Sequence, residues 1–336
     1  MDNHSEVESL NLLYGTPSKL NPDWMEKSLS LPPKTANQRN IVDCFIFYNE
    51  LEMLECRLTV LYDIVDYFVI CEAAVTFVGK PKPFFYLENK DRFARFADKI
   101  VHVMMTNDNT GWIYNSQIQR GQEWINERTH RNGIARGIEQ LEKEGKIGQN
   151  RNTPNDDILV ICDLDEIPNP DLLQWLKKDD LIEGGYSSGS DHNGGECGEK
   201  WKDGGANLEM DFYFYNLTCI YLNGKWTKPK VVFFESFCNR YQKSPETIRE
   251  YCFNNTLKKG GWHLSYFGDE KFIKNKIENF AHQELNIEEF TNTEKIRKRI
   301  KNKTDLYDRK GEQFKYVKLE DNDFLPPAGV LLEKWK

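Results

Sequence analysis

The chain of 336 residues is long enough for one large domain, and its composition excludes several classes of protein. Apolar residues make up 39%, aromatic residues 13% and charged residues 29%, so the chain can bury a large core and is not disordered throughout. The 45 basic and 53 acidic residues give a net charge of −8, which would repel a nucleic-acid backbone. We therefore expect no nucleic-acid partner.

The sequence also contains no segment that directs it to a membrane. No run approaches the roughly 18 apolar residues of a membrane span, and the start, MDNHSEVESLNLLYG, lacks the basic and apolar regions of a secretory signal. The eight cysteines form no C-x-x-C motif and are expected to be reduced core residues. These features favour a soluble, cytoplasmic protein without a membrane span.

Strand-like and helical segments alternate after an irregular, proline-containing lead-in over residues 1–39. The run NIVDCFIFYN predicts a buried strand, and ELEMLECRLTVLYDIV predicts an amphipathic helix because its apolar residues recur every three or four positions. Then come a strand in DYFVICEA, a short helix near DRFARFADKI, a strand in VHVMM and a long polar helix from about Ser116 to Gly145. This alternation predicts a mainly parallel twisted sheet with helices on both faces.

The second half of the chain begins with a fourth strand, DDILVICD, which leads directly into acidic residues. Asn169 and Pro170 have the residue types of an N-cap and a first helical position before DLLQWL. Residues 184–205 are rich in glycine and predict a mobile insertion. Further strands are expected in EMDFYFYNLTCIYL, KVVFFESF and GWHLSYFG, then a helix over DEKFIKNKIENFAHQEL. One domain over 40–320, followed by a tail over 321–336, accounts for these elements.

The acidic residues after the fourth strand form the strongest candidate site. Ligands of open parallel sheets bind beyond the carboxyl ends of the strands, which is where Asp163, Asp165 and Glu166 lie. Two aspartates one residue apart leave an extended chain on the same face, and their oxygens suit Mg²⁺ or Mn²⁺. An ion held there would bind a diphosphate, as nucleotide-sugar chemistry requires. The alternative is a solvated acidic turn without a ligand.

Several stretches resemble glycosyltransferase family 17 when they are taken together. They run in the family's order from about residue 41 to residue 291: VDCFIFYNELEMLECRL, YDIVDYFVICEAAVTFVGKPKPFFY, ADKIVHVMM, DDILVICDLDEIPNPDLL and GGWHLSYFGDEKFIKNKIENFAHQELN. The resemblance implies a Rossmann-like α/β domain of the GT-A type and a metal-dependent, inverting enzyme. It further implies UDP-N-acetylglucosamine as the donor and a mannose-containing glycan as the acceptor.

The sequence departs from this family in three places. The glycine-rich segment looks like an insertion, and no membrane anchor precedes the domain. The stretch CEAAVTF differs from the sequence that the family usually has at this place. The acceptor and the compartment therefore stay open. The setting that fits best is a soluble one, including a glycan pathway encoded outside the Golgi system, as in some large viruses.

The metal site is assigned from the acidic motif and from the resemblance. Asp163 and Asp165 would bind the ion and the donor diphosphate, with Glu166 as a neighbouring contact to the donor. His263, in GWHLSYFG, would complete the metal site, as a late histidine does in many GT-A enzymes, or it is a histidine of the core. His282, in the last predicted helix, is expected to be structural.

Further residues are candidates for donor binding. Asn49 and Glu50 match the family's N-E-L motif at the end of the first strand. Glu72 lies at the end of the second strand, where the ribose or base of the donor would lie. Arg128 and Arg131, on the long helix, would clamp phosphate or position the acceptor. The alternatives are helix capping for Asn49, Glu50 and Glu72, and a solvated helix face for the two arginines.

An inverting transfer also needs a base for the proton of the acceptor hydroxyl. Asp269 and Glu270, at the start of the helix after GWHLSYFG, are the first candidates, with Glu235 and Asp211 behind them. The alternative is that acids at a helix start only balance its dipole.

Other functions remain open. They are the transfer of another nucleotide sugar, nucleotidyl transfer on the same metal and diphosphate platform, and glycan binding without catalysis.

Overall fold

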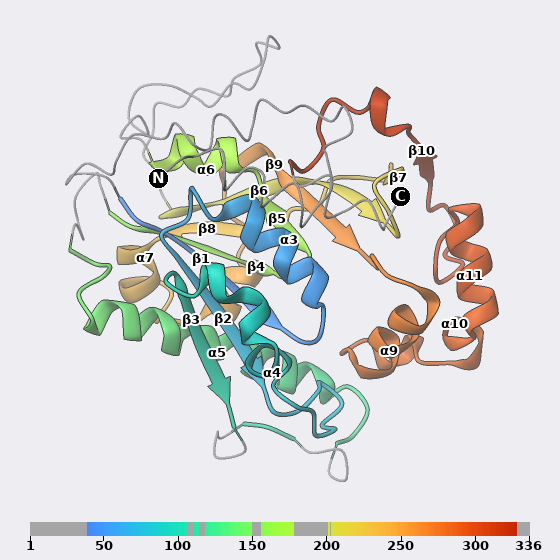
Figure 1. The fold of residues 1–336 in the computed structure, drawn as a ribbon, viewed down its shortest axis with the longest axis horizontal. Coiled ribbons are helices and arrows are strands. Elements are labelled where there is room, and N and C mark those ends of the chain that lie inside the picture. The colour runs from blue at the N-terminus through green and yellow to red at the C-terminus, as the bar shows by residue number, and fades with distance from the viewer. Residues whose placement is uncertain are drawn as a thin grey trace.

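The computed structural model of the chain describes residues 39–106, 111–113, 118–149, 156–177, 201 and 203–327. Its centre is a sheet whose first half is parallel (Figure 1). Four strands lie in the order β3-β2-β1-β4, and their bounds are β1 Ile41–Phe47, β2 Tyr67–Ala73, β3 Ile100–Met105 and β4 Ile158–Asp163. All three pairings among them are parallel, which confirms the expected α/β class with a largely parallel central sheet.

The sheet continues beyond β4 with strands of mixed direction, which the sequence did not predict. In the order β8-β6-β7-β10 these strands pair antiparallel with their neighbours. Their bounds are β8 Lys230–Phe233, β6 Gly205–Phe214, β7 Cys219–Tyr221 and β10 Phe314–Tyr316. A branch is formed by β9 (Thr256–Ser265), which pairs parallel with β6 and antiparallel with the short strand β5 (Glu166–Pro168).

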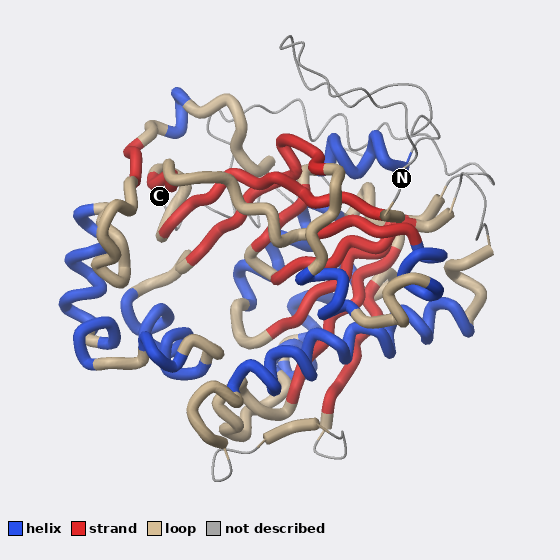
Figure 2. Tube along the Cα trace, turned by 180° about the vertical axis from the view of Figure 1, so that it is seen from behind, coloured by secondary structure: helices blue, strands red, loops and turns tan. Residues whose placement is uncertain are grey.

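Helices cover both faces of the parallel half because alternate strand residues point to opposite sides. In β1, Phe45 packs in one core cluster with Leu54 and Leu58 of α3 (Leu51–Leu61). Its neighbour Cys44 packs in the other cluster, with Ile134 of α5 (Glu123–Lys143). Seen from behind, α5 crosses the parallel strands (Figure 2). The other helical segments on this half are α4 Phe85–Glu88, the 3-10 helix η1 Lys90–Phe96, α6 Pro170–Lys177, α7 Phe234–Asn239 and α8 Pro245–Glu250.

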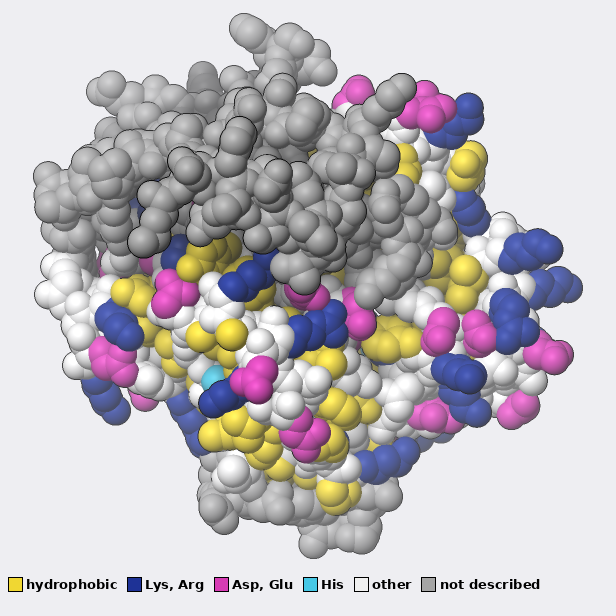
Figure 3. Space-filling view, viewed as in Figure 1, with side chains coloured by type: hydrophobic (Ala, Val, Ile, Leu, Met, Phe, Trp, Pro, Cys, Tyr) yellow, Lys and Arg dark blue, Asp and Glu magenta, His cyan; other side chains and the backbone are white. Residues whose placement is uncertain are grey.

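The C-terminal helices lie beside the mixed half of the sheet, and all but the last of them share an apolar cluster of their own (Figure 1). They are α9 Glu270–Asn279, η3 Gln283–Leu285, α10 Glu288–Thr291, α11 Thr293–Asn302 and η4 Leu319–Asp321. Basic side chains gather on the outer surface over α11, whose sequence is TEKIRKRIKN (Figure 3). No helix within the described ranges is both long and apolar enough to cross a membrane.

Three expected elements differ from the observed ones. The long helix begins at Glu123 rather than near Ser116, and in KVVFFESF the strand stops at Phe233 and α7 begins at Phe234. The helix expected over DEKFIKNKIENFAHQEL ends at Asn279, so His282 lies outside it. The lead-in and nearly all of the glycine-rich segment lie outside the described residues, and the domain limits stay a prediction.

Candidate active site

The acidic motif forms the turn between β4 and β5. Asp163 is the last residue of β4, Glu166 is the first residue of β5, and Asp165 lies on the turn between them. The short strand β5 pairs with β9, and Glu166 lies opposite His263 in this ladder. The pairing therefore brings the motif and a histidine from the far part of the sequence to one place.

Arg57 of α3 fixes the backbone of this turn from inside the core. Its guanidinium donates from Nη1 to the carbonyl oxygens of Asp163, Leu164 and Glu166 at 3.0, 3.0 and 2.7 Å. It also donates from Nε and Nη2 to both carboxylate oxygens of Asp43 at 2.8 and 2.7 Å, and neither side chain is exposed. The turn is thus held in place by a buried ion pair whose arginine also supplies donors to three of its carbonyl oxygens.

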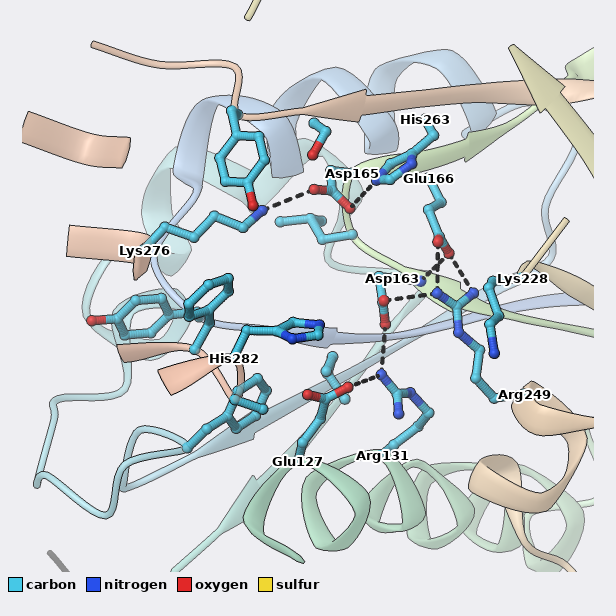
Figure 4. A pocket seen from close by; sticks show the side chains of 18 of the residues that line it. Glu127, Arg131, Asp163, Asp165, Glu166, Lys228, Arg249, His263, Lys276 and His282 are labelled. Atoms are coloured by element: carbon cyan, nitrogen blue, oxygen red, sulfur yellow. Dashed lines mark hydrogen bonds and ion pairs between the residues drawn. The ribbon is translucent and has the colours of Figure 1, made fainter. Parts of the chain in front are cut away.

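Two further arginines hold the carboxylates of the motif (Figure 4). Arg249 of α8 donates to both oxygens of Glu166 at 2.6 Å and to Asp163 Oδ2 at 2.9 Å. Arg131 of α5 donates to Asp163 Oδ1 at 3.2 Å and also pairs with Glu127 and Glu246. Burial alone would raise the pKa of Asp163, but Arg249 and Arg131 hold this pKa well below its usual range. Asp163 is therefore ionised at neutral pH.

Asp165 lies between a lysine and a histidine. Its Oδ2 accepts a hydrogen bond from Lys276 Nζ at 2.9 Å, and its Oδ1 lies 3.8 Å from His263 Nε2. Burial would raise the pKa of Asp165, yet Lys276 and His263 lower it below its ordinary value. Burial also lowers the pKa of His263, whose ring stacks on Phe212 with a centroid distance of 4.3 Å. His263 is thus a neutral imidazole beside an ionised carboxylate at neutral pH.

These groups line a cavity of about 1050 Å³ beyond the carboxyl ends of the parallel strands. This volume is large enough for a nucleotide sugar, since small-molecule pockets range from about 300 to 1,000 Å³. Aromatic side chains from several elements complete the wall: Tyr48, Phe77, Trp124, Phe212, Trp226 and Tyr266. The cavity therefore joins charged groups that suit phosphate with flat rings that suit a sugar.

Most of the predicted site residues line this cavity. They are Glu50, Arg128, Arg131, Asp163, Asp165, Glu166 and His263. Two predicted donor residues do not line it. Asn49 donates from Nδ2 to Asn275 at 3.2 Å. Glu72 is fully buried, where it accepts from the backbone N–H of Tyr86 and contacts His102.

The predicted bases Asp269 and Glu270 are also not among the residues that line the cavity. Asp269 caps α9 by accepting from the backbone N–H groups of Lys271 and Phe272. Glu270 pairs with Arg297 of α11 at 2.5 Å. Of the reserve candidates, Asp211 pairs with Lys225 and Glu235 lies on α7. The expectation that Asp269 or Glu270 reaches the reacting atoms is therefore not supported, and their capping and ion pairing account for both.

Sequence reasoning missed Arg57, Arg249 and Lys276, and it considered Trp226 only as a ring that could stack on a sugar. Trp226 donates from Nε1 to Glu166, and Lys276 lies on α9 beside Asp165. Each is a common residue type on an ordinary helix or loop, so the sequence carried no local signal. The only available hint was the number of carboxylates, because buried acids require cationic partners.

A sheet with an acidic turn and a large cavity at its carboxyl edge is typical of an α/β enzyme domain that binds a phosphorylated ligand. Residues 28–184 match the model of glycosyltransferase family 17, which includes β1 to β5 and the acidic turn. The family resemblance that the sequence predicts is thus confirmed over these residues, which are similar to glycosyltransferase family 17.

The chain is also similar to curated mammalian proteins. It is 26% identical over 241 residues to the β-1,4-mannosyl-glycoprotein 4-β-N-acetylglucosaminyltransferases of Rattus norvegicus and Homo sapiens. Its identity to the protein of the same name from Mus musculus is 25%. Each alignment covers 68% of this chain and 40% of the relative, so the chain spans about two fifths of the length of these relatives.

Proposed function

We propose that the protein is a metal-dependent, inverting glycosyltransferase of the GT-A type. It transfers N-acetylglucosamine from UDP-N-acetylglucosamine to a mannose-containing glycan. The observation that carries this proposal is the D-L-D-E turn inside a cavity of about 1050 Å³ at the carboxyl edge of the sheet. The names of the relatives support the choice of donor sugar and acceptor.

The residues around Asp165 fit a divalent ion such as Mn²⁺ or Mg²⁺. The distance of 3.8 Å between Asp165 Oδ1 and His263 Nε2 is too long for a hydrogen bond. Two atoms that bind one ion at about 2.0–2.2 Å lie about 3.0 Å apart at neighbouring octahedral positions, so the two side chains would move closer together by less than about 1 Å to bind it. The neutral state of His263 is the state that binds metal. The described residues contain no group of three His, Cys, Asp or Glu side chains that could hold a metal, so diphosphate oxygens and water would supply the other ligands.

The charges around the motif also favour a cation there. The carboxylates of Asp163, Asp165, Glu166, Glu127 and Glu246 meet the three cations of Arg131, Arg249 and Lys276. Within this cluster of ion pairs, five negative and three positive charges leave a net charge of −2, whereas the whole cavity lining has seven acidic and eight basic side chains, and the basic groups outside the cluster would bind the donor diphosphate. When bound, the ion would act as a Lewis acid that stabilises the leaving diphosphate.

The chain's own residues have the remaining tasks. Arg131 and Arg249 keep Asp163 ionised and fix its orientation. Lys276 presents an ammonium group at the cavity wall, where it would bind a phosphate oxygen of the donor. The aromatic wall would orient the sugar rings and exclude water from the reacting centre.

The test is a donor panel of UDP and GDP sugars with mannose-containing acceptors, measured as nucleoside diphosphate release and as glycosylated product. We expect product from UDP-N-acetylglucosamine with Mn²⁺ and loss of product after chelation. Turnover of a nucleoside triphosphate in the absence of any sugar nucleotide would contradict the proposal, as would saccharide binding without turnover of any donor.

Binding of UDP with Mn²⁺ provides a readout that does not depend on turnover. By calorimetry, Asp165→Asn and His263→Ala are expected to weaken Mn²⁺-dependent UDP binding by at least about tenfold, a size typical of lost ligand contacts. Glu320→Gln is the matched control, because Glu320 is exposed and pairs with Lys318 at 3.5 Å. Unchanged binding in both site variants would remove the metal role of Asp165 and His263.

A further inference from the structure

The cavity contains a histidine whose position follows from the early end of α9. After Asn279 the chain leaves the helix, and Phe280 is in an extended conformation. His282 then stands before η3, on the cavity wall. Its imidazole projects into the cavity between Glu127 on one side and Asp163 and Asp165 on the other (Figure 4). Half of the side chain (50%) is exposed, so the ring is open to a ligand in the cavity.

A carboxylate and an aromatic ring fix the orientation of this imidazole. Nδ1 of His282 lies 2.6 Å from Glu284 Oε1, which makes Nδ1 the N–H donor because an ionised carboxylate only accepts. The ring also meets Trp124 of α5 edge to face, with a centroid distance of 4.6 Å and an interplanar angle of 87°. Nε2 has no hydrogen-bond or ion-pair partner among the described residues. Its lone pair is therefore available to a proton from the cavity.

We propose that His282 is the general base of the transfer and that Glu284 is the residue that positions it. This inference rests on the proposed function. The acceptor hydroxyl oxygen forms a bond to the anomeric carbon of the donor sugar while the bond from that carbon to the diphosphate oxygen breaks. The electron pair of the broken bond leaves on the nucleoside diphosphate, and the hydroxyl proton passes to Nε2. Glu284 stabilises the imidazolium that results, as a carboxylate does for other histidine bases.

The other acids of the cavity are less suited to this task. Asp163 and Asp165 each bind a cationic side chain, which lowers their affinity for a proton, and both oxygens of Glu166 are already bound by Arg249. Glu127 is the principal rival because it lines the cavity and burial raises its pKa. However, its Oε1 accepts from Arg131 at 2.8 Å, and that contact favours the ionised form. His282 differs from Glu127 because it has a lone pair on the cavity side and, within the part of the chain that the structure describes, no cation in contact.

The decisive measurements use His282→Ala in the full chain, with turnover and donor binding recorded separately. The turnover number is expected to fall by about 10²–10⁴-fold, the usual contribution of a general base, while UDP binding stays within twofold of wild type. Free imidazole should restore part of the turnover of His282→Ala, since removal of a half-exposed ring leaves a space open to solvent.

Two more variants separate base catalysis from a structural role. His282→Gln can still donate a hydrogen bond to Glu284 but has no basic nitrogen, so it should lose as much turnover as His282→Ala. Glu284→Gln should lose about tenfold, with KM unchanged. Glu127→Gln should retain more activity than either His282 variant, and the exposed Glu320→Gln should match wild type.

The outcomes distinguish this inference from the proposed function. A wild-type protein that transfers no sugar from any donor refutes the proposed function itself. An active wild type refutes the inference if His282→Ala keeps its turnover within twofold or if imidazole restores none of the lost turnover. A greater loss of turnover in Glu127→Gln than in His282→Ala would assign the base to Glu127 and overturn the role of His282.

Discussion

At the scale of single residues, the acidic turn depends on a buried cation that never faces the cavity. Arg57 binds Asp43 and three carbonyl oxygens, and neither member of the ion pair is exposed. A buried pair of this kind adds little net stability relative to an apolar pair of the same size, but removal of one partner leaves the other charge without compensation. Arg57 therefore fixes the conformation of the turn more than it adds to stability.

Replacement of Arg57 by methionine should destabilise the protein by about 3–5 kcal/mol, the cost of leaving one buried charge alone. Urea denaturation followed by circular dichroism would measure this change. Arg92→Met is the control, because Arg92 pairs with Glu55 on a partly exposed surface and should cost about 0–1 kcal/mol. Equal losses in the two variants would show that Arg57 has no special role.

The residue scale also shows how much of the site could be predicted from the sequence. Asp163, Asp165 and Glu166 could be predicted because they directly follow an apolar strand. Their partners could not, since Arg249 is 83 residues from Glu166 and Lys276 is 111 residues from Asp165. No local sequence pattern identifies partners that are so far apart along the chain. For a related reason, the sequence could not distinguish a helix cap from a catalytic acid at Asp269, because both roles use the same residue type.

At the scale of elements, α5 lies against the sheet more closely than an ordinary helix could. A Cβ atom added at Gly133 would lie 2.1 Å from Met105 Sδ and 2.8 Å from Cys71 Sγ. One added at Gly137 would lie 2.5 Å from Val69 Cγ1. The two glycines therefore allow α5 to bring Arg131 and Glu127 to the edge of the cavity.

Gly133→Ala tests this close approach, since intrinsic helix propensity and packing predict opposite signs. Alanine is favoured over glycine inside a helix by about 1 kcal/mol, but the contact with Met105 and Cys71 should overpack the core and cost about 1–3 kcal/mol. We expect a lower melting temperature. Arg136→Ala, at an exposed position of the same helix, should change stability by less than about 0.5 kcal/mol. A rise in the melting temperature of Gly133→Ala would contradict the packing argument.

Element types were predictable wherever periodicity was clear. The four parallel strands and α3 follow the expected segments closely, because apolar runs and leucine spacing distinguish strand from helix. The segment KVVFFESF was misassigned in its second half, since a short apolar run fits a strand or a buried helix equally well.

At the scale of the whole molecule, stability should depend on pH through a histidine buried between α5 and β2. His130 donates from Nε2 to the carbonyl oxygen of Cys71 at 2.9 Å, and burial lowers its pKa from 6.5 to about 3. Between these two values the unfolded chain binds a proton that the folded protein does not bind. The free energy of unfolding therefore falls as the pH decreases from about 6.5 toward 3.

One such group contributes a slope of at most about 1.4 kcal/mol per pH unit. His130→Gln, which retains a donor for the carbonyl of Cys71, should reduce the slope of unfolding free energy against pH across this window. Denaturant titrations at a series of pH values would measure both slopes. His282→Gln is a suitable comparison because that ring is half exposed, and a slope unchanged in His130→Gln would refute the prediction.

The overall architecture could be predicted only in part. Alternation of strands and helices indicated the parallel half, whereas the pairing of β8, β6 and β9 could not be deduced, because strand order across a mixed sheet leaves no periodic signal.

The pairing between β5 and β9 has a consequence for the order in which the site forms as the protein folds. The acidic turn ends at Glu166, whereas Arg249, His263 and Lys276 come later in the chain. A nascent chain that ends after Glu166 but before Arg249 would thus contain the acidic turn with none of those three partners. The site is therefore complete only after β9 pairs with β5 in the register that places Glu166 opposite His263. A shift of this register by one residue would turn the imidazole to the other face of the sheet.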